Sequence, residues 1–536
     1  MNIKQLLLAA VAAVFAVSAA VAQVPNSDQD TKRKINEAVM GVYNDQLREH
    51  PDDYATLFAR ANQYYFNGDS RRALDDVNGV LKAVPEKEKE LRFDAYMLRA
   101  KLNDDRNNLD GELADLQAAA GINPSSLACI DMMGKLSYKM GDLDAAEKNF
   151  QIIMRDNPRN YDALYWQGKV EAKRQNYERA ANYIDKAVEL FPAESQVYVN
   201  RADVLKMMGE NKAAAKNYIY ALSGNNTSLA ISEIFDMANT NYADVMAALD
   251  DAIGKAPRVA TYYRISASVA MAHNHYGQAL RRLQSVIDNN LLDNDAVCYD
   301  AAMCQFQLND MDAALDLVNK AIDKRSGEPD YYILKSCILA HSGAGNLTAA
   351  LNAANQASAI NDTYVPALIA RARVFVAMRK DKEALPLLNQ AVMTDASNAE
   401  ALLLRGWVNK YRLRNADAAN ADFQKVLLGG SDMASLRGFA LHELGRTDEA
   451  RQWAEKIIAD NTITGGQAYY YASALLSDIG DNDQAYKYLE AALANGYGSA
   501  FEVSVSEEPY VNLKLVRRHP QFAALVSQYG DNFAVK

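Results

Sequence analysis

The feature that most constrains this chain is a pattern that occurs twice in succession between Leu127 and Glu194. The first copy reads LACIDMMGKLSYKMGDLDAAEKNFQIIMRDNPRN, and the second follows without insertion as YDALYWQGKVEAKRQNYERAANYIDKAVELFPAE. Equivalent positions in the two copies are 34 residues apart: Gly134 and Gly168, Ala146 and Ala180, Pro158 and Pro192. A strict period of this length is typical of repeat proteins, in which each copy forms one supersecondary unit.

The composition of each copy predicts two amphipathic helices that cross closely. Small residues occupy positions 8 and 20, where the two helix surfaces can approach each other. Gly141 and Asp142 supply the turn between the helices, and Pro158 ends the second helix. A single unit of this kind cannot bury its apolar face, so we expect neighbouring units to stack.

The period, the small residues at positions 8 and 20 and the proline at position 32 resemble the tetratricopeptide repeat. Further pairs of small residues at the two crossing positions are Ala61 and Ala73, Ala202 and Ala214, Ala267 and Ala279, Ala302 and Ala314, Ser336 and Ala350, Ala372 and Ala384, Gly406 and Ala419, Gly438 and Ala450, and Ser473 and Ala485. The resemblance spans roughly residues 32–494 and is closest to exported bacterial proteins of the Bacteroidetes type. It implies an all-α fold: a right-handed α-solenoid superhelix of about thirteen helix–turn–helix repeats with helical end caps.

The N-terminal residues are typical of a secretory signal peptide. Lys4 precedes the apolar run Leu6–Val17, and Ala20-Val21-Ala22 is a cleavage site of small residues. The expected organisation is a signal peptide (1–22), a lead and capping helix (23–53), repeats 1–5 (54–225), repeats 6–13 (226–494) and a C-terminal helical cap (495–536). We therefore expect a periplasmic or secreted protein of a Gram-negative envelope, with no transmembrane segment after cleavage.

The repeat register slips in the sixth copy. Pro192 and Pro257 are 65 residues apart, three short of two periods. Glu233 and Val245 replace the small crossing residues, and Ser223–Asn226 ends the preceding helix early. Because both changes loosen the same helix crossing, we predict a seam at this point of the array.

Composition and motifs exclude several function classes. The formal net charge of −11 argues against nucleic acid as a partner. The four cysteines lack the spacing of a disulfide scaffold or of a paired metal site. The sequence contains none of the common hydrolase, nucleotide-binding or calcium-binding motifs. His273 and His275 fall in a turn that we expect to be exposed rather than metal-bound. We therefore predict no metal, no cofactor and no enzyme activity.

A charge pair recurs at fixed positions. Position 7 is arginine and position 23 is aspartate in three distant repeats: Arg60 with Asp76, Arg99 with Asp115, and Arg405 with Asp422. Recurrence across repeats favours a bridge between the two helices of one repeat over a binding site.

The resemblance implies that positions 2, 5, 9, 12 and 13 of each first helix face a concave groove. In the third to fifth repeats these positions carry lysines and tyrosines, namely Lys135, Tyr138, Lys139, Tyr165, Lys169, Lys173 and Lys206. Toward the C-terminus they turn aromatic, with Trp407, Tyr411, Phe439 and Tyr470. Lysines in a groove favour an acidic ligand, and aromatic side chains could anchor a partner helix or pack between repeats. A fully solvated face is the alternative for the lysines.

These observations predict an exported, non-enzymatic scaffold that binds protein or peptide segments, possibly acidic ones, in its groove. The alternative is an outer-membrane-associated protein that binds glycans or nutrients and is built on the same helices. Such proteins usually carry a lipid-anchoring cysteine and long insertions, and neither is evident in this sequence.

Overall fold

The computed structural model describes residues 29–222, 228–429, 436–459, 466–506, 509 and 511–535, with side chains from residue 36 onward. The predicted signal peptide (1–22) and the Ser223–Asn226 segment lie outside the described residues. The protein is 79% helical, and its described part contains no strand. The predicted all-α solenoid of paired helices is therefore confirmed. No helix in this part of the chain is long and apolar enough to cross a membrane.

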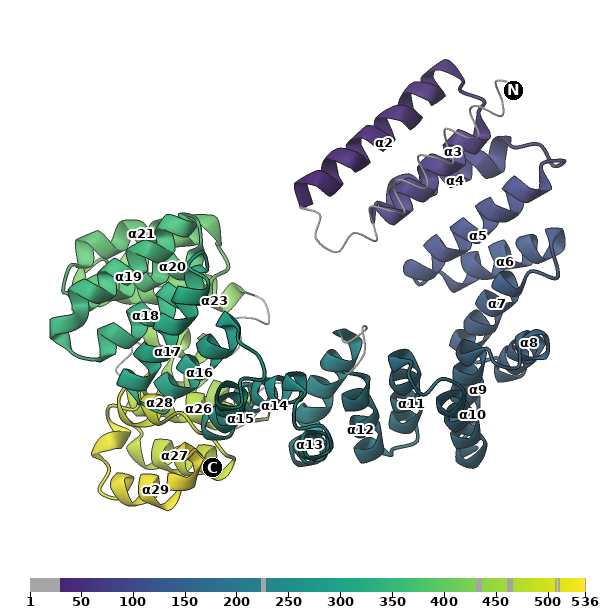
Figure 1. Cartoon of the computed structure of the whole chain (residues 1–536). Helices are drawn as coiled ribbons and strands as arrows, with labels where there is room; N and C mark the ends of the chain where they lie inside the picture. Colours follow the sequence, from purple (N-terminus) through teal and green to yellow (C-terminus); the bar gives the residue numbers. More distant parts are fainter. Residues whose placement is uncertain are drawn as a thin grey trace. The chain divides into compact units, whose positions relative to one another are not determined.

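The chain divides into two compact units at Glu210/Asn211. The helices of unit 1 are α2 (Gln29–Glu49), α3 (Tyr54–Phe66), α4 (Ser70–Ala83), α5 (Lys89–Asp105), α6 (Leu109–Ile122), α7 (Leu127–Met140), α8 (Leu143–Asp156), α9 (Tyr161–Lys173), α10 (Tyr177–Leu190) and α11 (Ser195–Met207). From α3 onward they pack as successive antiparallel pairs, α3 with α4 through α9 with α10 (Figure 1). These pairs are the first four repeats that the sequence predicts, and α2 packs on α3 as the N-terminal cap.

Unit 2 contains the remaining repeats. Its main helices are α12 (Asn211–Ala221), α13 (Ser228–Lys255), α14 (Ala260–Ala272), α15 (Tyr276–Asp288), α16 (Asp295–Gln307), α17 (Met311–Lys324), α18 (Pro329–His341), α19 (Leu347–Ile360), α20 (Val365–Ala377), α21 (Asp381–Thr394), α22 (Ala399–Trp407), α23 (Ala416–Leu428), α24 (Arg437–Glu443), α25 (Thr447–Ile458), α26 (Gln467–Ile479) and α27 (Asn482–Ala494). The short 3₁₀ helix η1 (Ala344–Asn346) precedes α19, and α28 (Ala500–Ser504), η4 (Val516–Arg518), α29 (Phe522–Gln528) and η5 (Gly530–Phe533) follow α27. The fifth predicted repeat is divided, because α11 ends unit 1 and α12 packs on α13 in unit 2.

The small residues at positions 8 and 20 lie where the paired helices cross. Ala61 and Ala73 have no exposed surface. At Gly134 a Cβ atom would lie 2.8 Å from Cε1 and Cζ of Phe150, closer than side-chain carbons normally approach. At Gly168 it would lie 2.8 Å from Cγ2 of Ile184. The residues at the crossing positions are therefore small because the facing helix leaves no room for a larger side chain.

The turns inside the repeats have a common geometry. Gly141 ends α7 in the left-handed region with φ 86°, a conformation that glycine adopts without steric cost. Asp142 then caps α8, and its side chain accepts a hydrogen bond from the Ala145 backbone N–H at 3.0 Å. Arg379 takes the same left-handed conformation between α20 and α21, so the turn persists without glycine.

The predicted arginine–aspartate bridges are confirmed. Their closest nitrogen–oxygen distances are 2.7 Å for Arg60–Asp76, 2.6 Å for Arg99–Asp115 and 2.6 Å for Arg405–Asp422. Each arginine also donates to an asparagine of the preceding second helix: Asn44, Asn78 and Asn389 respectively. The arginine therefore links its own repeat to the repeat before it, a second role that the sequence analysis missed.

The two helices of the sixth repeat are joined by a kink rather than by a turn. α13 runs through both of its helices, and only Asn241 (φ −140°, ψ 53°) leaves the helical region inside it. Val245 is fully buried and Glu233 is half-buried. The looser packing predicted for this repeat stays a prediction.

The eleventh repeat contains a π-helix. Between α22 and α23 the chain forms the π-helix η2 (Val408–Arg412). Its hydrogen bonds join residues five positions apart, whereas those of an α-helix join residues four apart. Its crossing residues Gly406 and Ala419 are 13 positions apart, against 12 for Gly134 and Ala146. The π turn absorbs this extra residue, so that Arg405 still reaches Asp422.

The C-terminal segment packs back on the start of unit 2. Ser499 Oγ donates to Gln307 Oε1 at 2.6 Å, α28 contacts α16, and η5 contacts α15 (Figure 1). The turn at His273 and Asn274 is buried: the two residues are 4% and 6% exposed. Gly498 of the C-terminal segment lies against the Asn274 carbonyl, whereas the His273 ring contacts the Ala238 carbonyl and the Tyr242 ring of α13. The expectation that this histidine turn is exposed is therefore wrong, because α13 and the C-terminal segment both pack on it.

Candidate functional site

The predicted groove residues of unit 1 lie on three successive first helices. We call this set the lysine–tyrosine face; its members are Lys135, Tyr138 and Lys139 on α7, Tyr165, Lys169 and Lys173 on α9, and Lys206 on α11. Trp166, which the sequence analysis did not include, lies at its centre. The ring centroids of Tyr138 and Tyr165 are 5.4 Å and 5.5 Å from that of Trp166. The face is therefore a continuous aromatic surface that joins α7 to α9.

Two lysines of the lysine–tyrosine face already have carboxylate partners. Lys135 Nζ lies 2.8 Å from Asp131 and 2.9 Å from Asp162, so it bridges α7 and α9. Lys139 pairs with Asp104 of α5. Their charges are largely compensated within the protein, and they offer little attraction to an outside anion.

Lys169 and Lys173 have different surroundings, because aromatic rings rather than carboxylates are their neighbours. Lys169 Nζ lies 4.6 Å from the Trp166 ring centroid, 5.2 Å from that of Tyr165 and 5.4 Å from that of Tyr138. Lys173 Nζ lies 4.4 Å from the Tyr138 centroid and donates to the Tyr138 carbonyl at 3.1 Å. These cation–π contacts hold both ammonium groups in place. Neither lysine forms a direct ion pair in the part of the chain that the structure describes, although the Asp203 carboxylate acts on Lys169 through Tyr165.

The pKa values of Lys169 and Lys135 are shifted in opposite directions, in keeping with their different neighbours. Burial lowers the pKa of Lys169, and the charge of Lys173 lowers it further, while Asp203 opposes the shift. For Lys135 burial also disfavours the charge, but the hydrogen bonds that its ammonium group donates to Asp131 and Asp162 outweigh burial and leave the pKa raised. Positive charge is therefore stabilised within the protein at Lys135 and disfavoured by burial at Lys169.

The third helix of the face contributes a hydrogen bond. Tyr165 Oη donates to Asp203 of α11 at 2.7 Å, and Lys169 Nζ donates to Tyr165 Oη at 3.3 Å. Burial and the Asp203 carboxylate raise the pKa of Tyr165 far above its usual value. Tyr165 thus remains a neutral donor and fixes α9 against α11.

The four aromatic residues predicted toward the C-terminus do not form one surface. Phe439 is 1% exposed and belongs to the core, so it offers nothing to a partner. Tyr411 donates to Glu443 at 2.9 Å and is 43% exposed. Trp407 and Tyr470 both line a cavity of about 710 Å³ in unit 2. Trp407 is thus near both Tyr470, across the cavity lining, and Tyr411, whose ring centroid lies 5.6 Å from its own.

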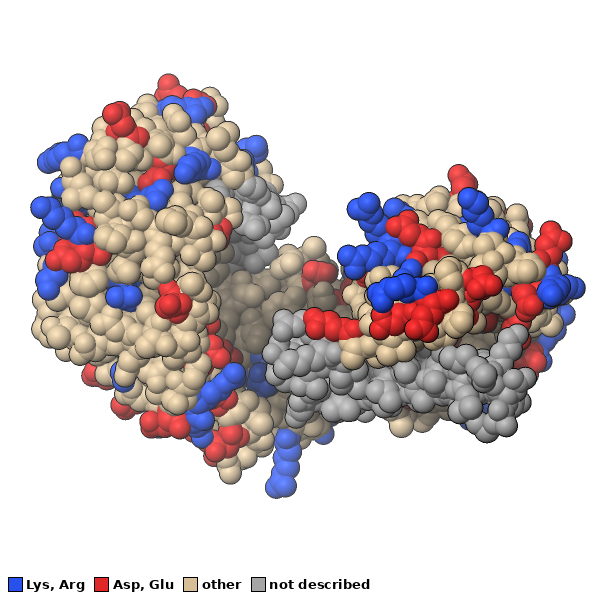
Figure 2. All heavy atoms as spheres, turned by 90° about the horizontal axis from the view of Figure 1, so that it is seen from above, with Lys and Arg blue, Asp and Glu red and all other residues tan. Residues whose placement is uncertain are grey.

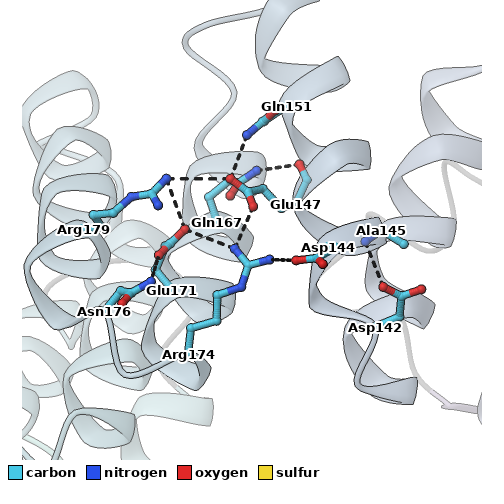
Figure 3. Close-up of polar contacts among 10 residues, drawn as sticks. All are labelled: Asp142, Asp144, Ala145, Glu147, Gln151, Gln167, Glu171, Arg174, Asn176 and Arg179. Atoms are coloured by element: carbon cyan, nitrogen blue, oxygen red, sulfur yellow. Dashed lines mark hydrogen bonds and ion pairs between the residues drawn. The ribbon is translucent and has the colours of Figure 1, made fainter.

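A polar cluster between α8, α9 and α10 was not predicted (Figure 3). Glu171 has no exposed side-chain surface and accepts from Asn176 at 2.8 Å. Arg174 and Arg179 lie 3.5 Å and 3.3 Å from its carboxylate and also reach Glu147 of α8. The sequence signal was a glutamate on the buried face of an amphipathic helix. The cluster ties the third repeat to the fourth and is a structural feature.

The face of the molecule seen in Figure 2 has no large patch of one charge. On the visible face of each unit, acidic and basic side chains are interspersed (Figure 2). No group of three or more metal-ligating side chains occurs in the part of the chain that the structure describes. The lysine–tyrosine face and the cavity of unit 2 are therefore the two candidate sites.

Comparison with known proteins identifies the repeats. Residues 58–126, 132–195 and 266–329 match the family model described as tetratricopeptide repeat. No curated protein matches the sequence.

Similar solved structures include a tetratricopeptide repeat protein from Parabacteroides merdae (15% identity, 53% of this chain and 98% of that one, TM-score 0.29). Yeast Tom70 is 14% identical over 76% of this chain and 98% of its own, with a TM-score of 0.35. YrrB, described as a TPR protein with an unusual peptide-binding site, is 17% identical over 41% of this chain and 95% of its own, with a TM-score of 0.27.

Proposed function

We propose, from the premise that the chain is a tetratricopeptide repeat protein, that it is an exported, non-enzymatic scaffold. Its lysine–tyrosine face binds an extended segment of a partner protein. The observation that carries this proposal is the cluster of Tyr138, Tyr165 and Trp166 around the Lys169 ammonium group. Aromatic rings supply apolar contact, and Lys169, which contacts Asp203 only through Tyr165, supplies charge. Together they favour a segment with both apolar and acidic residues.

Only some of the lysines that the sequence places in the groove are proposed to bind the partner. Lys135 and Lys139 hold carboxylates of the protein itself, whereas Lys169 and Lys173 remain for the partner. An exposed ion pair contributes only about 0.2–1 kcal/mol. Two such pairs give weak, salt-sensitive binding, and the tyrosine and tryptophan rings must supply most of the specificity.

Export is supported by the sequence of residues 1–22 alone. Intact-mass measurement of the protein from its native envelope tests it, and cleavage after Ala22 is the expected result. A retained Met1 would contradict the proposal.

The binding test compares two double variants. The partner is first identified by co-purification from the native source, and its affinity is then measured by calorimetry. Lys169→Glu with Lys173→Glu should lower the affinity by about tenfold or more, because two attractive contacts become repulsive. The matched control changes Lys148 and Lys186, which are exposed on the second helices α8 and α10, to glutamate.

The control variant has the same net charge as the test variant but a native lysine–tyrosine face. Equal affinity of both variants for the partner would show that the face is only solvated surface. An oligosaccharide array run beside the protein partner separates a scaffold from a glycan-binding protein.

A further inference from the structure

The cavity of unit 2 has the size of a small-molecule site. Its volume is about 710 Å³, within the range of roughly 300–1,000 Å³ that is usual for ligand pockets. The first helices α16, α18, α20, α22 and α26 contribute to its lining, and α28 and the residues after it also line it. The cavity therefore combines the inner surfaces of successive repeats with the C-terminal segment.

Aromatic side chains from distant helices meet at its wall. The Phe501 ring of α28 lies 4.5 Å from Phe306 of α16 and 4.7 Å from His341 of α18, centroid to centroid. Trp407 and Tyr471 line the same space. Flat rings at several points of the wall suit a planar, apolar body.

Among the lining residues that the structure describes, basic side chains exceed acidic ones: Arg373, Arg379, Arg412 and Lys514 against Glu400 and Glu502. Both acids are engaged within the protein. Glu400 lies 2.8 Å from Arg373, and Glu502 accepts a hydrogen bond from Tyr497. Glu507 and Glu508, which follow Ser506 in the sequence, lie outside the described residues.

Arg412 is the cation best placed for a ligand. Its guanidinium carbon lies 5.0 Å from the Trp407 ring centroid, and its Nε lies 3.8 Å from Asp381. The two groups form an ion pair, but that separation is too long for a hydrogen bond, so a bound carboxylate would compete with Asp381 for the guanidinium. A planar guanidinium next to an aromatic ring presents paired donors that match a carboxylate.

We infer that this cavity binds an organic carboxylate carried on an aromatic or similarly apolar body. Arg412 contacts the carboxylate, and the Trp407 and Phe501 rings contact the body. Two sources have this chemistry: a free aromatic acid, and a peptide whose last residue is aromatic. The inference does not depend on the lysine–tyrosine face of unit 1.

The test uses the full chain and a matched pair of probes, naphthylacetate and naphthylacetamide. Calorimetry should show about tenfold tighter binding of the acid, since hydrogen bonds to a charged group are stronger than those to a neutral one. In a Trp166→Phe, Trp453→Phe background, Trp407 is the remaining tryptophan and its fluorescence should change on binding. N-acetylated Gly-Gly-Phe with a free or an amidated carboxyl group distinguishes a peptide source from a free acid.

Arg412→Gln should remove the preference for the acid and leave the binding of the amide nearly unchanged. Arg446→Gln is the control, because Arg446 forms a surface pair with Glu449 outside the cavity. If Arg412→Gln does not fold, Arg412→Lys replaces it: this variant keeps the charge but loses the paired donors, so the preference for the acid should weaken. Equal affinity for acid and amide, or no saturable binding of either by the parent protein, would overturn the inference.

Discussion

Replacing Gly134 with alanine tests the idea that the helix crossing is set by paired residue sizes. A Cβ atom there would lie 2.8 Å from Phe150, which is fully buried. Where alanine occupies this position, the residue 16 places later is generally smaller than phenylalanine: Ala61 with Val77, Ala100 with Leu116, Ala302 with Val318 and Ala372 with Leu388. Ala202 with Tyr218 departs from this pattern.

Overpacking a core typically costs about 1–3 kcal/mol. The higher helix propensity of alanine returns up to about 1 kcal/mol. We therefore expect Gly134→Ala to lower the free energy of unfolding by about 1–2 kcal/mol. Phe150→Leu alone should also destabilise, because it leaves a cavity. The double variant recreates the alanine–leucine pair of other repeats, so the two changes should be coupled by about 1–3 kcal/mol, within the range for residues in contact.

Trp166 stacks on Phe150 with centroids 5.8 Å apart, so its fluorescence reports on this part of unit 1. Urea titrations in a Trp407→Phe, Trp453→Phe background give the four free energies of the cycle. Additive effects, with the double variant as unstable as the sum of the single ones, would show that the glycine is not there to make room for the ring.

Three further predictions concern other parts of the chain. Glu171→Gln should destabilise unit 1 by about 2 kcal/mol, measured by the same urea titration. Breaking a fully buried pair costs roughly 3–5 kcal/mol, and the cost here is smaller because Arg179 is half-exposed. Burial lowers the pKa of His275 to about 4, so the unfolded chain binds a proton at a higher pH than the folded protein does. The free energy of unfolding should therefore decrease as the pH falls from 6.5 toward 4. The loss is about 3 kcal/mol, and the pH dependence should be weaker in His275→Gln when urea midpoints are compared from pH 7 to 4.5. Hydrogen exchange should be faster in residues 228–255 than in residues 127–156, and equal protection would remove the predicted seam.

The repeat period predicted most of the helices because the same physical requirement recurs in each copy. Every pair needs two small residues at its crossing, and their spacing is visible in the sequence. The π turn at Val408–Arg412 had a sequence signal of the same kind. Arg405 and Asp422 are 17 positions apart, where Arg60 and Asp76 are 16 apart. One extra residue between two fixed contacts must widen the helix or lengthen the turn.

The candidate sites were less predictable, because the sequence shows a side chain's position on its helix but not its partner on another. The lysines of the lysine–tyrosine face were assigned from their positions, yet Lys135 and Lys139 are held by Asp162 and Asp104 of neighbouring repeats. Their effect on a ligand depends on those pairs. Trp166 was missed because it lies outside the positions assigned to the groove, although its ring contacts Tyr138 and Tyr165.

The cavity of unit 2 depends on the summed rotation between successive repeats, which cannot be derived from any single repeat. Each repeat adds a small rotation to the stack, and the sum decides whether the end of the chain returns to an earlier repeat. In this chain the sum brings Phe501 against Phe306 of α16, with ring centroids 4.5 Å apart. The sequence could place Trp407 and Tyr470 on first helices, but not set Phe501 opposite them. The same closure places Gly498 against the Asn274 carbonyl and so accounts for part of the wrong expectation for the histidine turn. The rest comes from α13, whose Ala238 carbonyl and Tyr242 ring contact His273.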